Sequence, residues 1–318
     1  MTTLKVPAVV KLKENVIDEI YNFSPADAPL VSMIPTEKVH NVYFEWQRDI
    51  YRAANKDNAA LEGADASPAA ITQPGLLNNR TQIFQDAFKI SGTTEAVKKY
   101  GRAEEKARKL MKVAVELKKD QDAAMLASGA TVTDNGSNAG KLRGLYGFFT
   151  KGTFAGTAPD PTTNTAPVSG TDRALTDAMI KTAQQSCYEN GGAGEVLMCS
   201  PAHKVKISTF DWGVQRTHEV TAKAADIQPI SFDFIRGDFG TIKVVPNRNQ
   251  AISGAGLSDT LYMFDPDKLA KAVLRSYQVK RLADVGDSEQ HQVLTEVSLI
   301  VKDERTCYAI SDITASGS

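Results

Sequence analysis

Residues 53–79 have the sequence AANKDNAALEGADASPAAITQPGLLNN, and this stretch decides how the rest of the chain is interpreted. It lies between two segments that are typical of strands, NVYFEWQRDIYR at 41–52 and RTQIFQDAFKI at 80–90. Connections inside compact domains are mostly a few residues long, and structureless loops beyond about a dozen residues are functional or disordered. A loop of this length and composition therefore needs an explanation outside its own domain.

The two flanking segments are predicted to be strands. In the first, Phe44 and Trp46 alternate with polar or amphipathic neighbours, which is period-two patterning with aromatic enrichment. In the second, Phe84, Phe88 and Ile90 lie on one side. We expect these two strands to pair as one long hairpin that has the loop at its tip.

The next segment predicts the longest helix of the chain. Apolar residues, among them Ala114, Leu117 and Met125, recur at steps of three and four through residues 94–128, which is the pattern of one buried helical face. Thr93 or Thr94 is the expected N-cap, and Gly129 is the expected end. Lysines and arginines along this helix are interleaved with acidic residues, so a solvated face is favoured over a stripe that binds phosphate.

Helices and strands then alternate toward the C-terminus. Residues 131–170 are rich in Gly, Thr, Asn and Pro and predict a second surface excursion. A helix with a Thr171 or Asp172 cap should follow, and EVLMCS at 195–200 is typical of a strand that is buried on both faces. The end of the chain is rich in strands, and the whole pattern indicates an α+β protein.

Composition narrows the class of protein. The 318 residues include 37 basic and 38 acidic side chains, and 42% are apolar, so the chain can bury a core and has little net charge for non-specific nucleic-acid binding. The three cysteines (Cys187, Cys199 and Cys307) form no disulfide framework, which favours a reducing compartment. We expect neither a secretory signal nor a membrane-spanning helix.

A search for chemistry finds no convincing site. Cys199 and His203 are four residues apart, but a proline lies between them and no second pair of ligands is nearby. Asp233 and Asp238 flank Arg236, which is more typical of a turn with a local ion pair than of a catalytic pair. We therefore expect no catalytic residues, no cofactor and no metal, and the chain is interpreted as not being an enzyme.

Four stretches of sequence resemble one family. They are APLVSMIP (28–35), FEWQRDIYRAANKDNAALEGADAS (44–67), NRTQIFQDAFKISGTTEAVKKYGR (79–102) and VLRSYQVKRLADVGDSEQHQVLTEVSLIVKDERTCYAI (273–310). They are similar to tailed-phage major capsid proteins of the Hong Kong type, in which an EWQ motif precedes a LEGADA loop. The resemblance covers residues 28–130 and 255–312, whereas 131–250 match in element order alone.

The resemblance implies a tailed-phage major capsid fold with named parts. It contains an N-terminal arm, an extended hairpin called the E-loop, a spine helix in a peripheral (P) domain and a mixed axial (A) domain. The implied bounds are 1–39 for the arm, 40–92 for the E-loop, 93–130 for the spine helix, 131–170 for a surface loop excursion, 171–255 for the A domain and 256–318 for P-domain strands and the C-terminus.

The implied function is that of the major capsid protein of a tailed bacteriophage. Such chains self-assemble into hexamers and pentamers, which form an icosahedral head around double-stranded DNA. The implied partners are other copies of the chain, the portal protein, separate scaffolding and decoration proteins, and packaged DNA contacted without sequence specificity, with no membrane. The protein would be assembled in the host cytoplasm and would reside in the virion. The implied inter-subunit contacts are Glu45, Trp46, Arg48, Lys56, Leu61, Glu62 and Arg80.

Several alternatives stay open. A bacterial nanocompartment shell protein (encapsulin-like) has the same fold but encloses cargo protein. A soluble enzyme with an unrecognised site would use residues around Cys199, His203 and Asp233. A tail or baseplate protein would have a different topology. Some capsid families also cross-link their subunits, and Lys56 with Asn247 or Asn249 is the Lys–Asn pair that such a bond would use, although an unlinked Lys56 is favoured.

Overall fold

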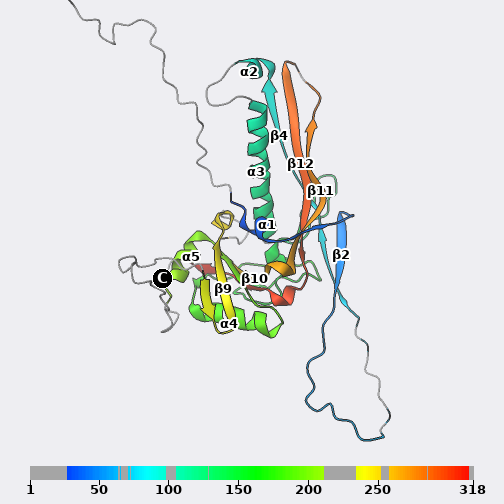
Figure 1. Ribbon diagram of the computed structural model, residues 1–318, viewed down its shortest axis with the longest axis vertical. Helices are drawn as coiled ribbons and strands as arrows, with labels where there is room; N and C mark the ends of the chain where they lie inside the picture. The colour runs from blue at the N-terminus through cyan, green and yellow to red at the C-terminus, as the bar shows by residue number, and fades with distance from the viewer. Residues whose placement is uncertain are drawn as a thin grey trace, which may run out of the picture.

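The computed structural model describes residues 27–63, 65, 71, 73–97, 105–127, 129–210, 234–251, 258–284 and 286–314. Two bodies adjoin in this part of the chain: an elongated one that contains α3 with long strands, and, below it in the view, a compact one around β9, β10 and α4 (Figure 1). Helices and strands are mixed along the sequence, which confirms the predicted α+β class. Among the described residues, no helix has the length and apolar character needed to span a membrane.

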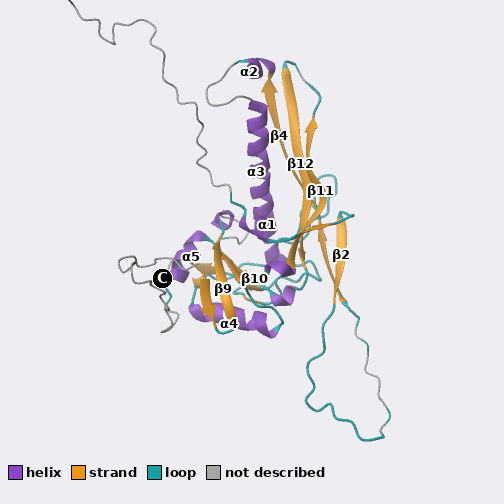
Figure 2. Cartoon of the chain, viewed as in Figure 1, coloured by secondary structure: helices purple, strands orange, loops and turns teal. Residues whose placement is uncertain are grey.

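The elongated body is a four-stranded sheet in the order β1–β11–β12–β4, and α3 packs on it (Figure 2). β1 is parallel to β11, whereas β11, β12 and β4 are antiparallel. Its strands are β1 Thr36–Lys38, β4 Gln82–Ser91, β11 Leu269–Arg281 and β12 Ser288–Val301, and its helices are α1 Pro29–Met33, α2 Gly92–Ala96 and α3 Glu105–Leu126.

Packing of α3 against the sheet gives the largest hydrophobic cluster. Val113, Leu117 and Met125 lie at four- and eight-residue steps on the buried face and join Phe84 of β4 in this cluster. The prediction of Leu117 and Met125 as core residues is therefore confirmed. Ala114, which was also expected on this face, is exposed, and Val113 is buried in its place.

The compact body is a six-stranded sheet in the order β5–β13–β10–β7–β9–β8, with α4 and α5 beside it. β7 lies between β10 and β9, and its four residues are all buried, as predicted from the run of apolar residues. The bounds are β5 Gly152–Thr153, α4 Asp177–Glu189, β7 Val196–Cys199, α5 Pro201–Ser208, β8 Phe234–Gly237, β9 Gly240–Pro246, β10 Leu261–Phe264 and β13 Tyr308–Ile310.

Short elements complete the described chain. β6 (Arg173–Ala174) pairs with β14 (Ile313–Thr314), and β2 (Tyr43–Arg48) pairs with β3 (Gly75–Arg80). The single-turn helices are η2 Leu145–Phe148, η3 Arg248–Ala251, η4 Pro266–Lys268 and η5 Glu304–Thr306.

The predicted pairing of the hairpin is wrong. Residues 43–48 pair with Gly75–Arg80, and the strand that carries Phe84 and Ile90 pairs instead with β12. The physical reason is burial, since Phe84 and Ile90 are covered in the elongated body. The projecting hairpin is therefore residues 43–80, with β2 and β3 as its stem and residues 49–74 as its tip.

The predicted single helix over 94–128 is interrupted. α2 starts after Ser91, whose hydroxyl accepts a hydrogen bond from the Thr94 N–H, so Ser91 is the cap and not Thr93 or Thr94. α2 ends at Ala96 because Val97 has extended backbone angles. The helix resumes by Glu105, and the intervening residues 98–104 lie outside the described part of the chain.

Two parts of the chain are placed differently from the expectation. Residues 142–149 fall inside the predicted surface excursion, yet Leu145, Phe148 and Phe149 are fully buried in the main core. The flanking Gly-rich and Thr-rich residues concealed this apolar run. Likewise β10 and β13 were expected among the P-domain strands, but they complete the six-stranded sheet of the compact body.

Candidate assembly interface

The hairpin projects away from both bodies (Figure 1). Its stem is regular, because β2 and β3 pair without a break from Tyr43 opposite Arg80 to Arg48 opposite Gly75. Within the described residues of the tip there is neither helix nor strand. A regular stem with an irregular, projecting tip is the arrangement expected of a segment whose contacts lie on another molecule.

Trp46 fixes one side of the stem to the elongated body. Its indole Nε1 donates a hydrogen bond to the Val301 carbonyl at 2.9 Å, at the end of β12. The ring lies 5.8 Å from Phe44 and 5.9 Å from Phe148, as measured between ring centroids. The indole is thus half-buried, and its N–H has a hydrogen-bond partner in its own chain, so it does not need one from a neighbouring subunit.

Asn79 fixes the other side of the stem and was not singled out from the sequence. It is fully buried, and its Nδ2 donates to the Leu299 carbonyl at 2.7 Å and the Arg143 carbonyl at 3.2 Å. Its Oδ1 accepts from the Arg143 N–H at 2.8 Å and from the Arg80 N–H at 2.8 Å. One side chain therefore joins β3 to β12 and to the buried segment before η2. No local pattern in the sequence signals these contacts, because the partners are far away along the chain.

Arg48 closes the stem with a charge pair. Its guanidinium pairs with the carboxylate of Glu304, which is buried, while the Arg48 side chain is 19% exposed. Burial lowers the pKa of Arg48, and the nearby charge of Arg305 lowers it further. Removing either partner would leave a desolvated charge, so this pair favours a single orientation of the stem.

The tip exposes apolar side chains. Tyr51 is 100% exposed, Ile71 89%, Leu61 84% and Ile50 58%. Single exposed apolar residues are normal on a protein surface, but four on one projecting loop are typical of an interaction site. Of these four residues, the sequence analysis predicted only Leu61 as a contact. The other three could have been found by looking for apolar residues within a loop that forms no core of its own.

The other expected contact residues lie on both parts of the hairpin. Lys56 and Glu62 are exposed at the tip, near Leu61 in sequence. Glu45 is exposed on the stem, where its carboxylate accepts a hydrogen bond from the Tyr43 hydroxyl at 2.5 Å. Arg80 is opposite Tyr43, with its guanidinium carbon 5.5 Å from the centre of that ring.

Two further surfaces carry exposed apolar groups. On the outer face of α3, Met111 is 73% exposed and Val115 is 41% exposed, one helical turn apart. On the compact body, Tyr188 and Phe239 stack with centroids 4.9 Å apart, and Phe234 at the edge strand β8 is 61% exposed. Neither surface contains the combination of groups needed for catalysis.

Two of the residues considered for an enzyme site, Cys199 and His203, are buried. Cys199 is buried on β7, and burial raises the pKa of its thiol to about 12, so it is not a thiolate at neutral pH. His203 is buried on α5 with its Nδ1 2.7 Å from the Ser200 hydroxyl, and burial lowers its pKa. Asp233 lies outside the described residues. A thiol that stays protonated is a poor nucleophile and a poor metal ligand.

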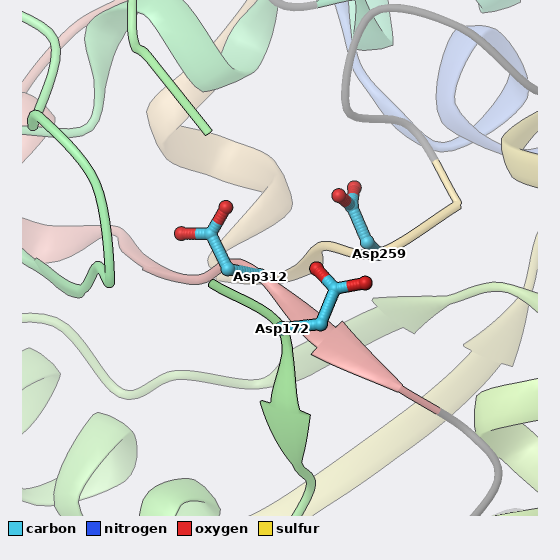
Figure 3. Close-up of side chains that lie close together, drawn as sticks. All are labelled: Asp172, Asp259 and Asp312. Atoms are coloured by element: carbon cyan, nitrogen blue, oxygen red, sulfur yellow. The ribbon is translucent and has the colours of Figure 1, made fainter. Parts of the chain in front are cut away.

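Three carboxylates lie close together beside β6 and β14. One oxygen each of Asp172, Asp259 and Asp312 lies within 4.8 Å of the others, and the three come from separate segments (Figure 3). Burial raises the pKa of Asp259, and the charges of Asp312 and Asp172 raise it further. Asp259 therefore takes up a proton at a higher pH than an isolated aspartate does.

Asp312 is already saturated by donors of its own chain. Burial by itself would raise its pKa, but four hydrogen bonds outweigh that effect and hold the pKa below its ordinary value. The carboxylate therefore joins two loops to the end of β13, which is a structural role. The donors are the N–H groups of Gly170 at 2.8 Å, Ala155 at 3.0 Å and Gly156 at 3.3 Å, and the Ser311 hydroxyl at 2.8 Å.

Asn247 and Asn249 are held in the interior, which argues against the Lys–Asn bond considered from the sequence. Both are buried, and their Nδ2 atoms donate to one oxygen of Asp122 at 2.7 and 2.8 Å. The other oxygen of Asp122 accepts from the Val31 N–H at 3.1 Å. This buried carboxylate joins α1, α3 and η3, and a lysine from a hairpin tip has no access to the two amides.

Comparison with known sequences identifies a family. The sequence profile described as SU10 major capsid protein matches residues 1–314. The major capsid protein of Escherichia phage Phieco32 is 24% identical over 316 residues, which cover 87% of this chain and 87% of that protein.

Comparison with solved structures identifies the fold. The capsid of a native GTA particle has a TM-score of 0.65 at 13% identity, covering 97% of this chain and 98% of that chain. The capsid of cyanophage A-1(L) has a TM-score of 0.59 at 13% identity, covering 98% of each chain. The holo-SrpI encapsulin complex from Synechococcus elongatus PCC 7942 has a TM-score of 0.56 at 9% identity, covering 100% of this chain and 98% of that chain.

These findings agree with the arrangement of the chain. A sheet with a spine helix, a compact mixed body and a projecting hairpin form the fold of phage capsid subunits, as the sequence motifs implied. At such low identities the structures show the fold alone, whereas the profile covers nearly the whole sequence. This chain therefore belongs to the SU10 major capsid protein family and is a bacteriophage major capsid protein, a structural component of the virion.

Proposed function

We propose that copies of this chain form hexamers and pentamers that close into an icosahedral head around double-stranded DNA. The observation that carries this proposal is the hairpin, which has a stem held by buried partners and a tip with four exposed apolar side chains. The proposed partners are other copies, a portal protein, separate scaffolding and decoration proteins, and packaged DNA.

The hairpin tip is proposed to lie on a neighbouring subunit. Complete burial of an aliphatic or aromatic side chain stabilises an interface by about 1.5–3 kcal/mol, so the exposed tip residues can supply a useful part of a subunit contact. Association costs offset much of that gain, which leaves each contact weak. Closed symmetry then repeats the weak contact many times over the shell.

The expected contact residues divide into two proposed roles. Lys56, Leu61 and Glu62 are at the tip and are proposed to contact the neighbour directly. Trp46 and Arg48 are proposed to act indirectly, because their partners within the chain fix the direction in which the tip projects.

Glu45 and Arg80 are proposed to contact a neighbour from the stem. The Glu45 carboxylate is exposed, and the Arg80 side chain lies over Tyr43 at the surface of the hairpin. Exposed charges at the edge of an interface contribute more to the rate and register of association than to its final affinity. We therefore expect Glu45 and Arg80 to matter less than Leu61 for the stability of the assembled shell.

Packaged DNA is proposed to be contacted weakly and without sequence specificity. The formal net charge of the chain is −1, which gives little non-specific affinity for phosphates. A steep dependence of DNA retention on salt would contradict this part of the proposal.

The test replaces residues 52–72 with a Gly/Ser linker of equal length, so that β2, β3 and their buried partners stay intact. Wild type and variant are produced as full chains, with and without co-expressed scaffolding protein, and are compared by negative-stain electron microscopy and light scattering. We expect rings or shells from wild type and unassembled subunits from the variant. Shells from the variant in wild-type yield would show that the tip is not needed.

Two controls make that test specific. The melting temperature of the tip variant should equal that of unassembled wild type, because the described apolar side chains of the tip are exposed. Replacing residues 133–140, another exposed loop, by an equal Gly/Ser linker should leave assembly intact.

The content of the particle separates a phage head from a nanocompartment, whose shell shares the fold. Nuclease-protected double-stranded DNA in particles from infected cells supports the head. A co-purifying enzyme inside DNA-free shells supports the nanocompartment.

A further inference from the structure

A small exposed loop carries an Asn–Gly sequence in an unusual hydrogen-bonded setting. Val132 and Lys141 close the loop with two backbone hydrogen bonds, of 3.1 and 3.0 Å. Within it, residues 134–137 have the sequence DNGS, and all four are exposed. Asparagine followed by glycine is the sequence in which the next backbone nitrogen most easily reaches the side-chain amide, because glycine has no Cβ to obstruct it.

The groups around Asn135 hydrogen-bond its side-chain oxygen and the N–H of Gly136. Its Oδ1 accepts hydrogen bonds from the Ser137 N–H at 3.1 Å and the Asn138 N–H at 2.7 Å. The N–H of Gly136 donates to a carboxylate oxygen of Asp134 at 2.9 Å. The Asn135 Nδ2 has no hydrogen-bond partner within the described part of the chain.

We propose that Asn135 is a site of spontaneous covalent modification, assisted by Asp134. The Gly136 nitrogen attacks Cγ of Asn135, and its proton passes to the Asp134 carboxylate. A new Cγ–N bond forms, the Cγ–Nδ2 bond breaks, and Nδ2 leaves as ammonia with the transferred proton. Solvent water then opens the resulting five-membered succinimide at either carbonyl, which gives aspartate or isoaspartate at position 135.

Each contact has a definite role in that reaction. Negative charge develops on Oδ1 as the nitrogen attacks, and the two N–H donors of Ser137 and Asn138 lie where they stabilise it. A carboxylate within hydrogen-bond reach of the nucleophilic N–H is placed to act as a general base. Gly136 has a φ of +79°, a conformation that glycine adopts readily and other residues do not.

The chain contains a natural control in a second Asn–Gly pair. Asn190 and Gly191 follow α4, where the Gly191 N–H donates to the Tyr188 carbonyl at 3.0 Å. The Asn190 Nδ2 donates to the Ser186 carbonyl at 2.7 Å. Here the nucleophilic N–H faces a neutral carbonyl that cannot take its proton, and the leaving amide is held at the helix end. We therefore expect Asn190 to react much more slowly than Asn135.

The modification adds one negative charge per copy beside Asp134, and isoaspartate also lengthens the backbone of the loop. In a particle with many copies, the product would accumulate with age and would be detected as a growing fraction of more acidic protein. This inference concerns the exposed loop alone and does not rest on the proposed role of the hairpin.

The experiment incubates purified full-length protein at neutral and mildly alkaline pH and follows both Asn–Gly sites by peptide-mapping mass spectrometry. Electron-based fragmentation distinguishes isoaspartate from aspartate. The same chain unfolded in denaturant supplies the intrinsic rate of each dipeptide. We expect the two sites to react at similar rates when unfolded, and Asn135 to react several-fold faster than Asn190 when folded. An Asn135 rate at or below that of Asn190 in the folded chain overturns the proposal.

Two variants test the assignment of roles. Asp134→Asn keeps a hydrogen-bond acceptor beside the Gly136 N–H but removes the base, and we expect it to slow the reaction at Asn135 several-fold while Asn190 is unchanged. An unchanged rate would overturn the role of Asp134. Asn135→Gln, which would need a larger ring, should abolish the acidic population, and its persistence would place the modification elsewhere.

Discussion

At the base of the hairpin the buried side chain of Asn79 and the indole N–H of Trp46 have hydrogen-bond partners, whereas at its tip the exposed groups include apolar side chains. Asn79 makes four hydrogen bonds to β3, β12 and the segment before η2, and Trp46 donates to the end of β12. Tyr51, Leu61 and Ile71, by contrast, are at least 84% exposed. The same hairpin therefore has one end specified by its own chain and one end left for another.

This difference teaches how a subunit can fold alone and still depend on neighbours. Folding stability comes from the base, where lost contacts leave buried groups unsatisfied. Assembly depends on the tip, whose substitution costs the isolated subunit little. The two ends should thus respond in opposite ways to mutation, and the following predictions test that separation in order of decreasing effect on stability.

The largest effect is expected for Asn79→Ala. The substitution leaves two carbonyls and two N–H groups without their side-chain partner in a buried site, so we expect the free energy of unfolding to fall by about 3 kcal/mol. Chemical denaturation of the unassembled subunit measures this change.

The matched control for that prediction is Asn78→Ala, the adjacent residue on the same strand, which is half-buried. We expect a change within about 0.5 kcal/mol there. Equal losses at Asn78 and Asn79 would mean that strand propensity, and not the buried hydrogen bonds of Asn79, holds the base.

In the acidic cluster of Asp172, Asp259 and Asp312, two carboxylates should give the stability of the protein opposite dependences on pH. The pKa of Asp312 is lowered, so its contribution to stability is present above its unfolded pKa and is lost as the pH falls through the folded pKa. The pKa of Asp259 is raised, so its contribution is present below its unfolded pKa and is lost as the pH rises through the folded pKa.

We therefore predict opposite effects of the two amide variants at neutral pH. Asp312→Asn places an NH₂ group against N–H donors and should lower the free energy of unfolding by about 2 kcal/mol. Asp259→Asn removes a charge that burial and the neighbouring carboxylates disfavour, so it should raise the free energy of unfolding. Unfolding measured from pH 3 to pH 8 should also show a flatter acid limb for the Asp312 variant. Destabilisation by both variants would contradict the assignment.

The sequence alone predicted those elements whose residues contact others nearby in the sequence. The alternation of Phe44 and Trp46 predicted β2, and the helical spacing of Leu117 and Met125 predicted the buried face of α3. The chain composition of residues 53–79 predicted a projecting loop. All of these features depend on residues within a few positions of one another, so a local sequence pattern is enough to predict them.

The failures have a common physical cause, which is contact between residues that are distant in sequence. β3 has the unpromising sequence GLLNNR, and it is a strand because Asn79 bonds to Leu299 and Leu77 is buried. Phe84 gave the stronger strand pattern, but its partner is β12, so the predicted hairpin paired the wrong strands. The contact residues at the hairpin tip could be inferred only because the loop has no neighbouring segment in the sequence against which to pack.

A smaller loss is expected for Trp46→Phe at the base. The aromatic ring and its packing on Phe44 and Phe148 are kept, but the hydrogen bond to the Val301 carbonyl is removed. We expect the free energy of unfolding to fall by about 1 kcal/mol, measured by denaturant titration of unassembled subunits. A loss as large as that of Asn79→Ala would mean that the indole contributes more packing than the phenyl ring can replace.

The smallest effect on stability, and a large effect on assembly, is expected for Leu61→Asp at the tip. Leu61 is 84% exposed, so the free energy of unfolding should change by less than about 0.5 kcal/mol. A charge at a position proposed to be buried against a neighbour should nevertheless raise the protein concentration needed for assembly several-fold, as followed by light scattering. Asn58→Asp places the same charge on an exposed polar position of the tip and should assemble nearly as wild type. If both variants assemble equally well, Leu61 lies outside the contact. If both fail equally, repulsion between charged tips, and not loss of an apolar contact, explains the defect.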